Sequence, residues 1–93
     1  MREDLDARLP ALVRVVDDDA PVRESEAFVL QMAGFQVRQF ESAEQFLAGD
    51  DRKRCGALVL DIRMQGMSGM ELQRRIAAEG RSLPILFLTG HGD

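Results

Sequence analysis

The chain has 93 residues, 45% of them hydrophobic and 30% charged, which is the composition of one ordinary globular domain. Its 16 acidic and 12 basic residues give a net charge of −4, which argues against nucleic-acid binding by this segment. No apolar stretch approaches the ~20 residues of a membrane span, and a lone cysteine excludes an internal disulfide, so we expect a cytoplasmic protein without a membrane partner.

The first half of the chain predicts a strand and a long helix behind a polar leader. Residues 1–10 form that leader, and the predicted domain covers residues 11–93. The apolar run Leu12–Asp17 predicts a strand that is buried on both faces. A helix then begins near Pro21 and ends at Gly34. The apolar stripe of this helix, which we expect to face the core, consists of Val22, Phe28, Val29, Met32 and Ala33.

The rest of the chain alternates strands with shorter helices. Strands are predicted at Phe35–Phe40, Ala57–Asp61 and Pro84–Thr89. Capping boxes at residues 42–45 and 68–71 open two helices, and Asp50–Cys55 is expected to be a charged loop. The β-α-β-α-β-α-β order predicts an α/β fold with a doubly wound parallel sheet.

Aspartates follow two of the predicted strands. Asp17, Asp18 and Asp19 come at the end of the first strand, and Asp61 ends the strand at 57–61. In open α/β sheets the reacting groups gather beyond the carboxyl ends of the strands, so these carboxylates are expected to meet in one crevice. Several close anions need a proton or a cation among them, and oxygen ligands suit Mg²⁺. We interpret Asp19 as a turn or cap acid rather than a ligand.

Three motifs in the expected order resemble a known family. The strings VRVVDDDAPVRESEAFVLQMAGF, LDIRMQGMSGMEL and PILFLTGHGD resemble the receiver domain of bacterial two-component response regulators, most closely the nitrogen-fixation regulator (FixJ-like) type. The resemblance covers residues 11–93. It implies a flavodoxin-like receiver fold with strand order 2-1-3-4, truncated so that the fifth strand and the last two helices are missing.

The resemblance also implies roles for individual residues. Asp61 matches the phosphoacceptor. Asp18 matches a direct Mg²⁺ ligand, Asp17 a ligand that acts through water, and the backbone carbonyl of Arg63 a third metal ligand. Thr89 matches the switch hydroxyl that bonds to the phosphoryl group. In the loop after Asp61, the usual proline of the family is replaced by glutamine.

The function implied is that of a phosphoacceptor, not an enzyme. A sensor histidine kinase would phosphorylate Asp61, and an output domain outside this segment, transcriptional in function, would respond. One alternative is an inactive fragment that acts only as an interaction module, because the family's phosphoryl-binding lysine belongs to the missing fifth strand. Another is a haloacid-dehalogenase-like phosphotransferase, whose motif has a second acid where this chain has Arg63. A homodimer is expected through the exposed fourth strand or the uncovered face of the sheet.

Overall fold

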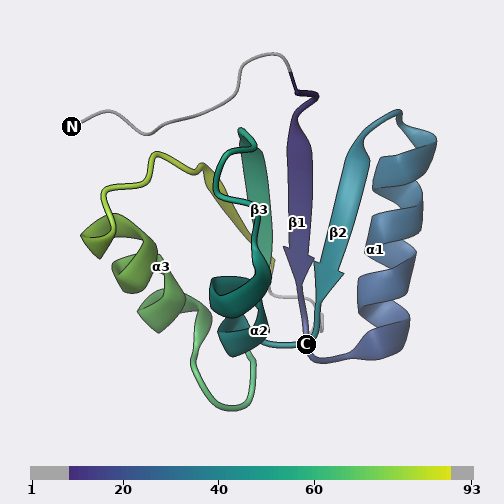
Figure 1. Cartoon of the computed structure of the whole chain (residues 1–93). Helices are drawn as coiled ribbons and strands as arrows, with labels where there is room; N and C mark the ends of the chain where they lie inside the picture. The colour runs from purple at the N-terminus through teal and green to yellow at the C-terminus, as the bar shows by residue number, and fades with distance from the viewer. Residues whose placement is uncertain (1–8, 89–93) are drawn as a thin grey trace.

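A computed structural model describes residues 9–88 and confirms the doubly wound α/β fold. The elements, in chain order, are β1 (Leu12–Val16), α1 (Ala20–Met32), β2 (Gln36–Phe40), α2 (Ala43–Gly49), β3 (Gly56–Asp61), α3 (Gly69–Ala78) and β4 (Ile85–Leu88). The four strands are parallel and lie in the order β2-β1-β3-β4, as Figure 1 shows. The final residue of the predicted last strand, Thr89, lies outside the described residues.

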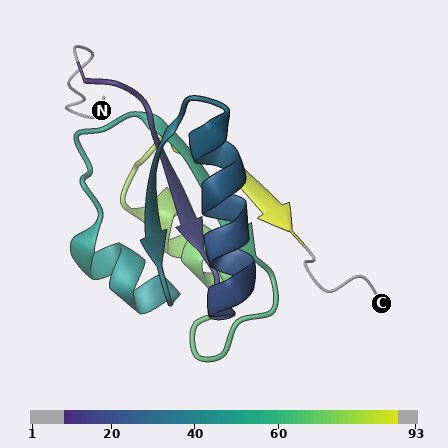
Figure 2. The same cartoon turned by 90° about the vertical axis from the view of Figure 1, so that its right-hand side faces the viewer.

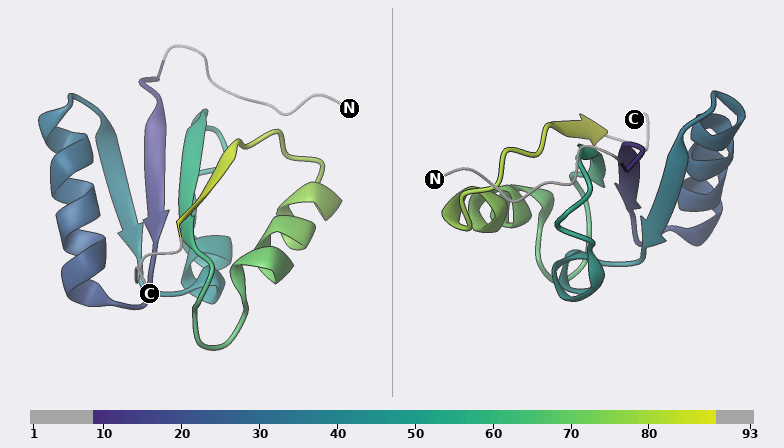
Figure 3. Two further views of the ribbon diagram at one scale, coloured as in Figure 1. Left: turned by 180° about the vertical axis from the view of Figure 1, so that it is seen from behind. Right: turned by 45° about the horizontal axis from the view of Figure 1, so that its top comes forward.

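The helices form two layers around the sheet. α1 lies on one side of the sheet, and α2 and α3 lie on the other, as right-handed crossovers between parallel strands require (Figures 2 and 3). All four strands run in the same direction, so their carboxyl ends share one edge of the sheet. Among residues 9–88, none of the helices has the length and apolar character needed to cross a membrane.

The hydrophobic core has two parts, one on each face of the sheet. The larger part lies beneath α2 and α3 and consists of Val16, Phe40, Ala43, Phe46, Leu58, Leu60, Leu72 and Ile76. Within it, the rings of Phe40 and Phe46 meet edge to face with centroids 5.5 Å apart. The smaller part, beneath α1, consists of Val13, Val15 and Val59, with Leu30 packed against it.

The predicted buried stripe of α1 is wrong in its position on the helix. Phe28, Val29 and Met32 are 61%, 65% and 72% exposed, whereas the buried residues of the helix are Arg23 and Ala27. The reason is that α1 lies over β1 and β2 and turns the face that carries Arg23 and Ala27 toward them. Of the three exposed side chains, Val29 lines an open groove between α1 and β4.

The predicted charged loop after α2 begins with a buried residue. Asp50 caps the carboxyl end of α2, and its side chain is fully buried against Arg14 of β1. Arg14 donates its Nε to Asp50 Oδ1 at 2.7 Å and its other nitrogens to the backbone carbonyls of Leu12, Asp51 and Arg54. A buried guanidinium needs this full set of acceptors, because an unpaired buried charge is costly.

Candidate functional site

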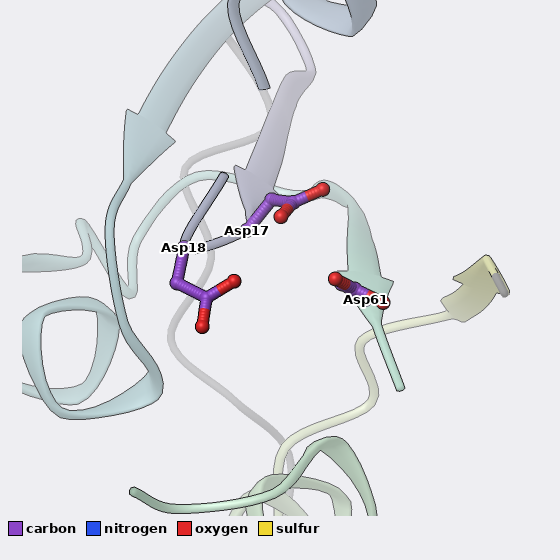
Figure 4. Close-up of side chains that lie close together, drawn as sticks. All are labelled: Asp17, Asp18 and Asp61. Atoms are coloured by element: carbon purple, nitrogen blue, oxygen red, sulfur yellow. The ribbon is translucent and has the colours of Figure 1, made fainter. Parts of the chain in front are cut away.

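Three carboxylates converge beyond the ends of β1 and β3. Asp17 and Asp18 follow β1 directly, and Asp61 is the last residue of β3. β1 and β3 are hydrogen-bonded neighbours, with Val16 opposite Leu60, so the residues that follow lie side by side. One carboxylate oxygen from each aspartate lies within 4.8 Å of the others (Figure 4). The structure therefore brings together the three aspartates that the strand ends single out.

The cluster has a buried and an exposed part. Asp17 and Asp61 are each 2% exposed, whereas Asp18 lies open to solvent. Burial raises the pKa of the Asp17 carboxyl above its ordinary value of 3.8, and the negative charges of Asp61 and Asp18 raise it further. The backbone N–H of Asp19 lowers the pKa in part by donating to Asp17 Oδ1 at 2.9 Å. The negative charges of the cluster thus add to the effect of burial on the pKa of Asp17.

Asp19 is a helix cap in the structure. Its Oδ1 accepts a hydrogen bond from the backbone N–H of Val22 at 3.2 Å, as an N-cap side chain does. The side chain is thereby directed into the first turn of α1 and away from the carboxylate cluster. This placement agrees with the interpretation of Asp19 as a cap acid.

The loop between β3 and α3 supplies backbone donors to the cluster. The N–H of Arg63 donates to Asp61 Oδ1 at 3.0 Å, and the N–H of Gln65 donates to Asp18 Oδ2 at 3.1 Å. These contacts bring the segment that carries the Arg63 carbonyl next to the acidic residues. Thr89, the predicted switch residue, lies outside the described residues.

The same loop is attached on its far side to α2. The N–H of Met67 donates to Glu44 Oε2 at 3.2 Å, across the glycine at position 66. Gly66 has a φ of 74°, a conformation that L side chains rarely adopt, and a Cβ there would lie 3.2 Å from Glu44 Oε2. Glycine therefore favours the loop conformation in which Gln65 contacts Asp18 and Met67 contacts Glu44.

Sequence reasoning missed Arg23, a buried cation beside the cluster. Its Nη1 donates to the backbone carbonyl of Asp17 at 2.8 Å, and its Nε donates to Gln39 Oε1 at 3.2 Å. The residue is 8% exposed and links α1 to the ends of β1 and β2. The sequence offered no signal for this role, because the buried face of α1 depends on where β1 and β2 lie.

α3 begins directly against Asp61. A Cβ at Gly69 would lie 3.1 Å from the Asp61 backbone oxygen and 3.3 Å from the Leu60 side chain. The helix is capped by Ser68, whose Oγ accepts from the Glu71 N–H at 3.1 Å. This close approach fixes the start of α3 relative to the phosphoacceptor candidate.

The donor set of the cluster fits a hard divalent cation. Carboxylate oxygens are the ligands that Mg²⁺ prefers, and the described cluster offers neither imidazole nor thiolate. Mg²⁺ keeps several waters and needs few protein ligands, which suits a cluster with one exposed member. A cation would also offset the repulsion that raises the pKa of Asp17.

Comparison with known proteins identifies a family over most of the chain. The model of the response regulator receiver domain family matches residues 13–93. The chain is 49% identical over 81 residues to the transcriptional regulatory protein FixJ of Rhizobium meliloti. The aligned region covers 87% of this chain and 40% of FixJ. It is 47% identical over 81 residues to the transcriptional regulatory protein TdiR of Thauera aromatica, covering 87% of this chain and 36% of TdiR. The chain thus spans well under half the length of these relatives.

Solved structures agree with the sequence comparison. FixJ-N superimposes with a TM-score of 0.82 at 47% identity, covering 91% of this chain and 68% of that one. The response regulator StyR gives a TM-score of 0.84 at 47% identity, covering 91% of this chain and 43% of the StyR chain. The response regulator TrrA of Thermotoga maritima, solved in complex with Mg²⁺ and BeF, gives a TM-score of 0.75 at 28% identity. The match covers 83% of this chain and 67% of the TrrA chain.

Proposed function

Because this chain belongs to the response regulator receiver domain family, we propose that it accepts a phosphoryl group from a sensor histidine kinase onto Asp61. The observation that carries the proposal is the position of Asp61, which ends β3 and faces the carboxylates of Asp17 and Asp18. Receiver domains are signalling domains, and membership of this family rules out the haloacid-dehalogenase-like alternative.

The chemistry assigned to Asp61 is nucleophilic attack on phosphorus. A carboxylate oxygen of Asp61 forms the new O–P bond while the bond from phosphorus to the histidine nitrogen of the donor breaks, with the two groups in line. Charge then develops on the phosphoryl oxygens and must be stabilised by positioned donors. The N–H of Arg63, which already donates to Asp61 at 3.0 Å, lies close enough to contribute.

Mg²⁺ is the cofactor of the proposal. Asp18, Asp61 and the backbone carbonyl of Arg63 would hold the ion directly, and Asp17 would hold it through water. When bound, the ion supplies positive charge that offsets the carboxylates and the transferred phosphoryl group. The structure of the response regulator TrrA in complex with Mg²⁺ and BeF supports Mg²⁺ as the metal.

The consequence of phosphorylation is a change outside this segment. We assign Thr89 as the hydroxyl that responds to the phosphoryl group, and a transcriptional output domain as the part that it controls. FixJ and TdiR, both transcriptional regulators, support the nature of the output. A single exposed cysteine, Cys55, is compatible with the cytoplasmic location that forms part of the proposal.

The proposal also includes a homodimer, in which the partner is a second copy of this chain. Within residues 9–88, β4 is an edge strand, and its Leu86 is 58% exposed. Val29 of α1 and Leu88 of β4 line an apolar groove of about 340 Å³, on the face of the sheet where α1 lies. An edge strand beside an apolar groove favours pairing between copies.

Phosphorylation of the chain itself tests the proposal. The chain is incubated with acetyl phosphate and Mg²⁺, then measured by intact-mass spectrometry, with a parallel sample in EDTA. The proposal expects a gain of one phosphoryl group that requires Mg²⁺. Absence of the gain in both samples would favour the alternative, a domain that only binds other proteins.

A further inference from the structure

Each of the three clustered carboxylates accepts a hydrogen bond from a backbone N–H. Asp17 Oδ1 accepts from the N–H of Asp19 at 2.9 Å, and Asp61 Oδ1 accepts from the N–H of Arg63 at 3.0 Å. Both of these donors are two residues along the chain from their acceptors, so each bond forms within one turn. They fix the two buried carboxylates to the ends of their own strands.

The hydrogen bond to Asp18 is different in origin. Asp18 Oδ2 accepts from the N–H of Gln65 at 3.1 Å, and the two residues are 47 positions apart in the sequence. Asp18 is the exposed member of the cluster, and burial does not restrict its side chain. Its carboxylate therefore depends on the loop between β3 and α3 for its orientation.

That loop is itself held in place. The Met67 N–H donates to Glu44 Oε2 at 3.2 Å, which attaches the loop to the first turn of α2. Gly66, between the two donors, has a φ of 74° and lies against the Glu44 carboxylate. The Gln65 N–H consequently belongs to a loop that a hydrogen bond to α2 and the conformation of Gly66 both restrain.

We infer that in this chain, which has glutamine where the family usually has proline, the backbone N–H of Gln65 positions Asp18 for binding the cation and so raises the affinity of the metal site. The inference rests on the proposed function, in which Asp18 is a direct ligand. A carboxylate that binds a metal through one oxygen is commonly hydrogen-bonded at the other, and loss of such a partner typically lowers metal affinity about 10–100-fold. Because this bond is open to water, we expect an effect of roughly 3–10-fold.

Two substitutions at position 65 separate the backbone donor from the side chain. Gln65→Pro removes the N–H, whereas Gln65→Ala retains it and removes only the side-chain amide. The wild type and both variants, labelled with ¹⁵N, are titrated with MgCl₂, and the amide shifts near residues 17–19 and 61–63 give Kd. Thermal unfolding without metal checks that each variant is folded.

The inference expects a roughly 3–10-fold higher Kd for Gln65→Pro and a wild-type Kd for Gln65→Ala. Equal affinity in all three proteins would overturn the inference and leave the metal site intact. Tighter binding by Gln65→Pro would also overturn it, since the N–H would then compete with the cation. Failure of the wild type to bind Mg²⁺ would overturn both the inference and the metal site itself.

A second measurement avoids proline altogether. Asp18→Ala removes the acceptor, so the Gln65 amide proton is expected to shift and to exchange faster with solvent. Asp51→Ala is the matched control, because Asp51 Oδ1 accepts from the Lys53 N–H at 3.0 Å in an equally exposed turn. It should change the Lys53 amide and leave Gln65 unaffected. A Gln65 amide that ignores Asp18→Ala contradicts the inference.

Discussion

The guanidinium of Arg14 and the carboxylate of Asp50 form a buried ion pair, with Nε donating to Oδ1 at 2.7 Å and neither side chain exposed. The second oxygen of Asp50 accepts from Arg81 Nη2, also at 2.7 Å. One carboxylate thus joins the central strand β1, the end of α2 and the segment that leads into β4. This network lies away from the aspartate cluster and connects the layers that position it.

Removing the shared carboxylate should destabilise the fold. Asp50→Ala leaves Arg14 buried without its charged partner, and breaking a buried pair in this way costs about 3–5 kcal/mol. Arg52→Ala is the control, because the pair between Arg52 and Glu79 is 43% and 38% exposed and contributes at most about 1 kcal/mol. Urea unfolding measures both variants. Similar losses for the two would show that the buried pair has no special role.

The space at the start of α3 gives a second prediction. Gly69→Ala should lower the free energy of unfolding by about 1–3 kcal/mol, because the new methyl group would press on the Asp61 backbone oxygen at 3.1 Å. Gly49→Ala is the matched control, since its Cβ would make ordinary contacts at 3.6 and 3.7 Å. Urea unfolding measures the free energy of unfolding of both variants. A Gly69→Ala protein as stable as Gly49→Ala would contradict the close packing.

The shifted pKa of Asp17 predicts a dependence of stability on pH. Because burial and the Asp61 charge raise this pKa in the folded state, protonated Asp17 favours folding. The stabilising contribution of protonated Asp17 is complete below pH 3.8, the ordinary pKa of the group, and is lost as the pH rises through the raised pKa of the folded state. In EDTA, Asp17→Asn should therefore become more stable relative to the wild type as the pH increases. A difference in unfolding free energy that stays constant with pH would argue against the shift.

Self-association gives a prediction about the apolar groove between α1 and β4. Val29→Lys places a charge on the apolar groove between α1 and β4, where Val29 is 65% exposed. If copies pair through this face, light scattering should show a dimer for the wild type and a monomer for the variant. Glu24→Lys, an exposed change on the same helix, should not affect the assembly. A monomeric wild type would refute the dimer.

The sequence predicted the elements and the aspartate cluster because both depend on local patterns. Strand ends are visible as apolar runs that stop on Asp17 and Asp61, and parallel neighbours bring such ends together. The ion pair of Arg14 was not predictable in the same way, since its partner Asp50 is 36 positions away. The face of α1 that is buried also depends on where β1 and β2 lie, which the periodicity of the helix does not specify.

The phosphorylation site of the chain tests the central claim most directly. The wild type, Asp61→Asn and Asp19→Asn are incubated with acetyl phosphate and Mg²⁺, and intact-mass spectrometry measures the phosphorylated fraction of each. The account predicts that Asp61→Asn gains no phosphoryl group, because its amide lacks the nucleophilic oxygen, and that Asp19→Asn keeps most of the wild-type gain, because asparagine also caps a helix. Phosphorylation of Asp61→Asn to the wild-type extent would contradict the assignment of Asp61 as the phosphoacceptor.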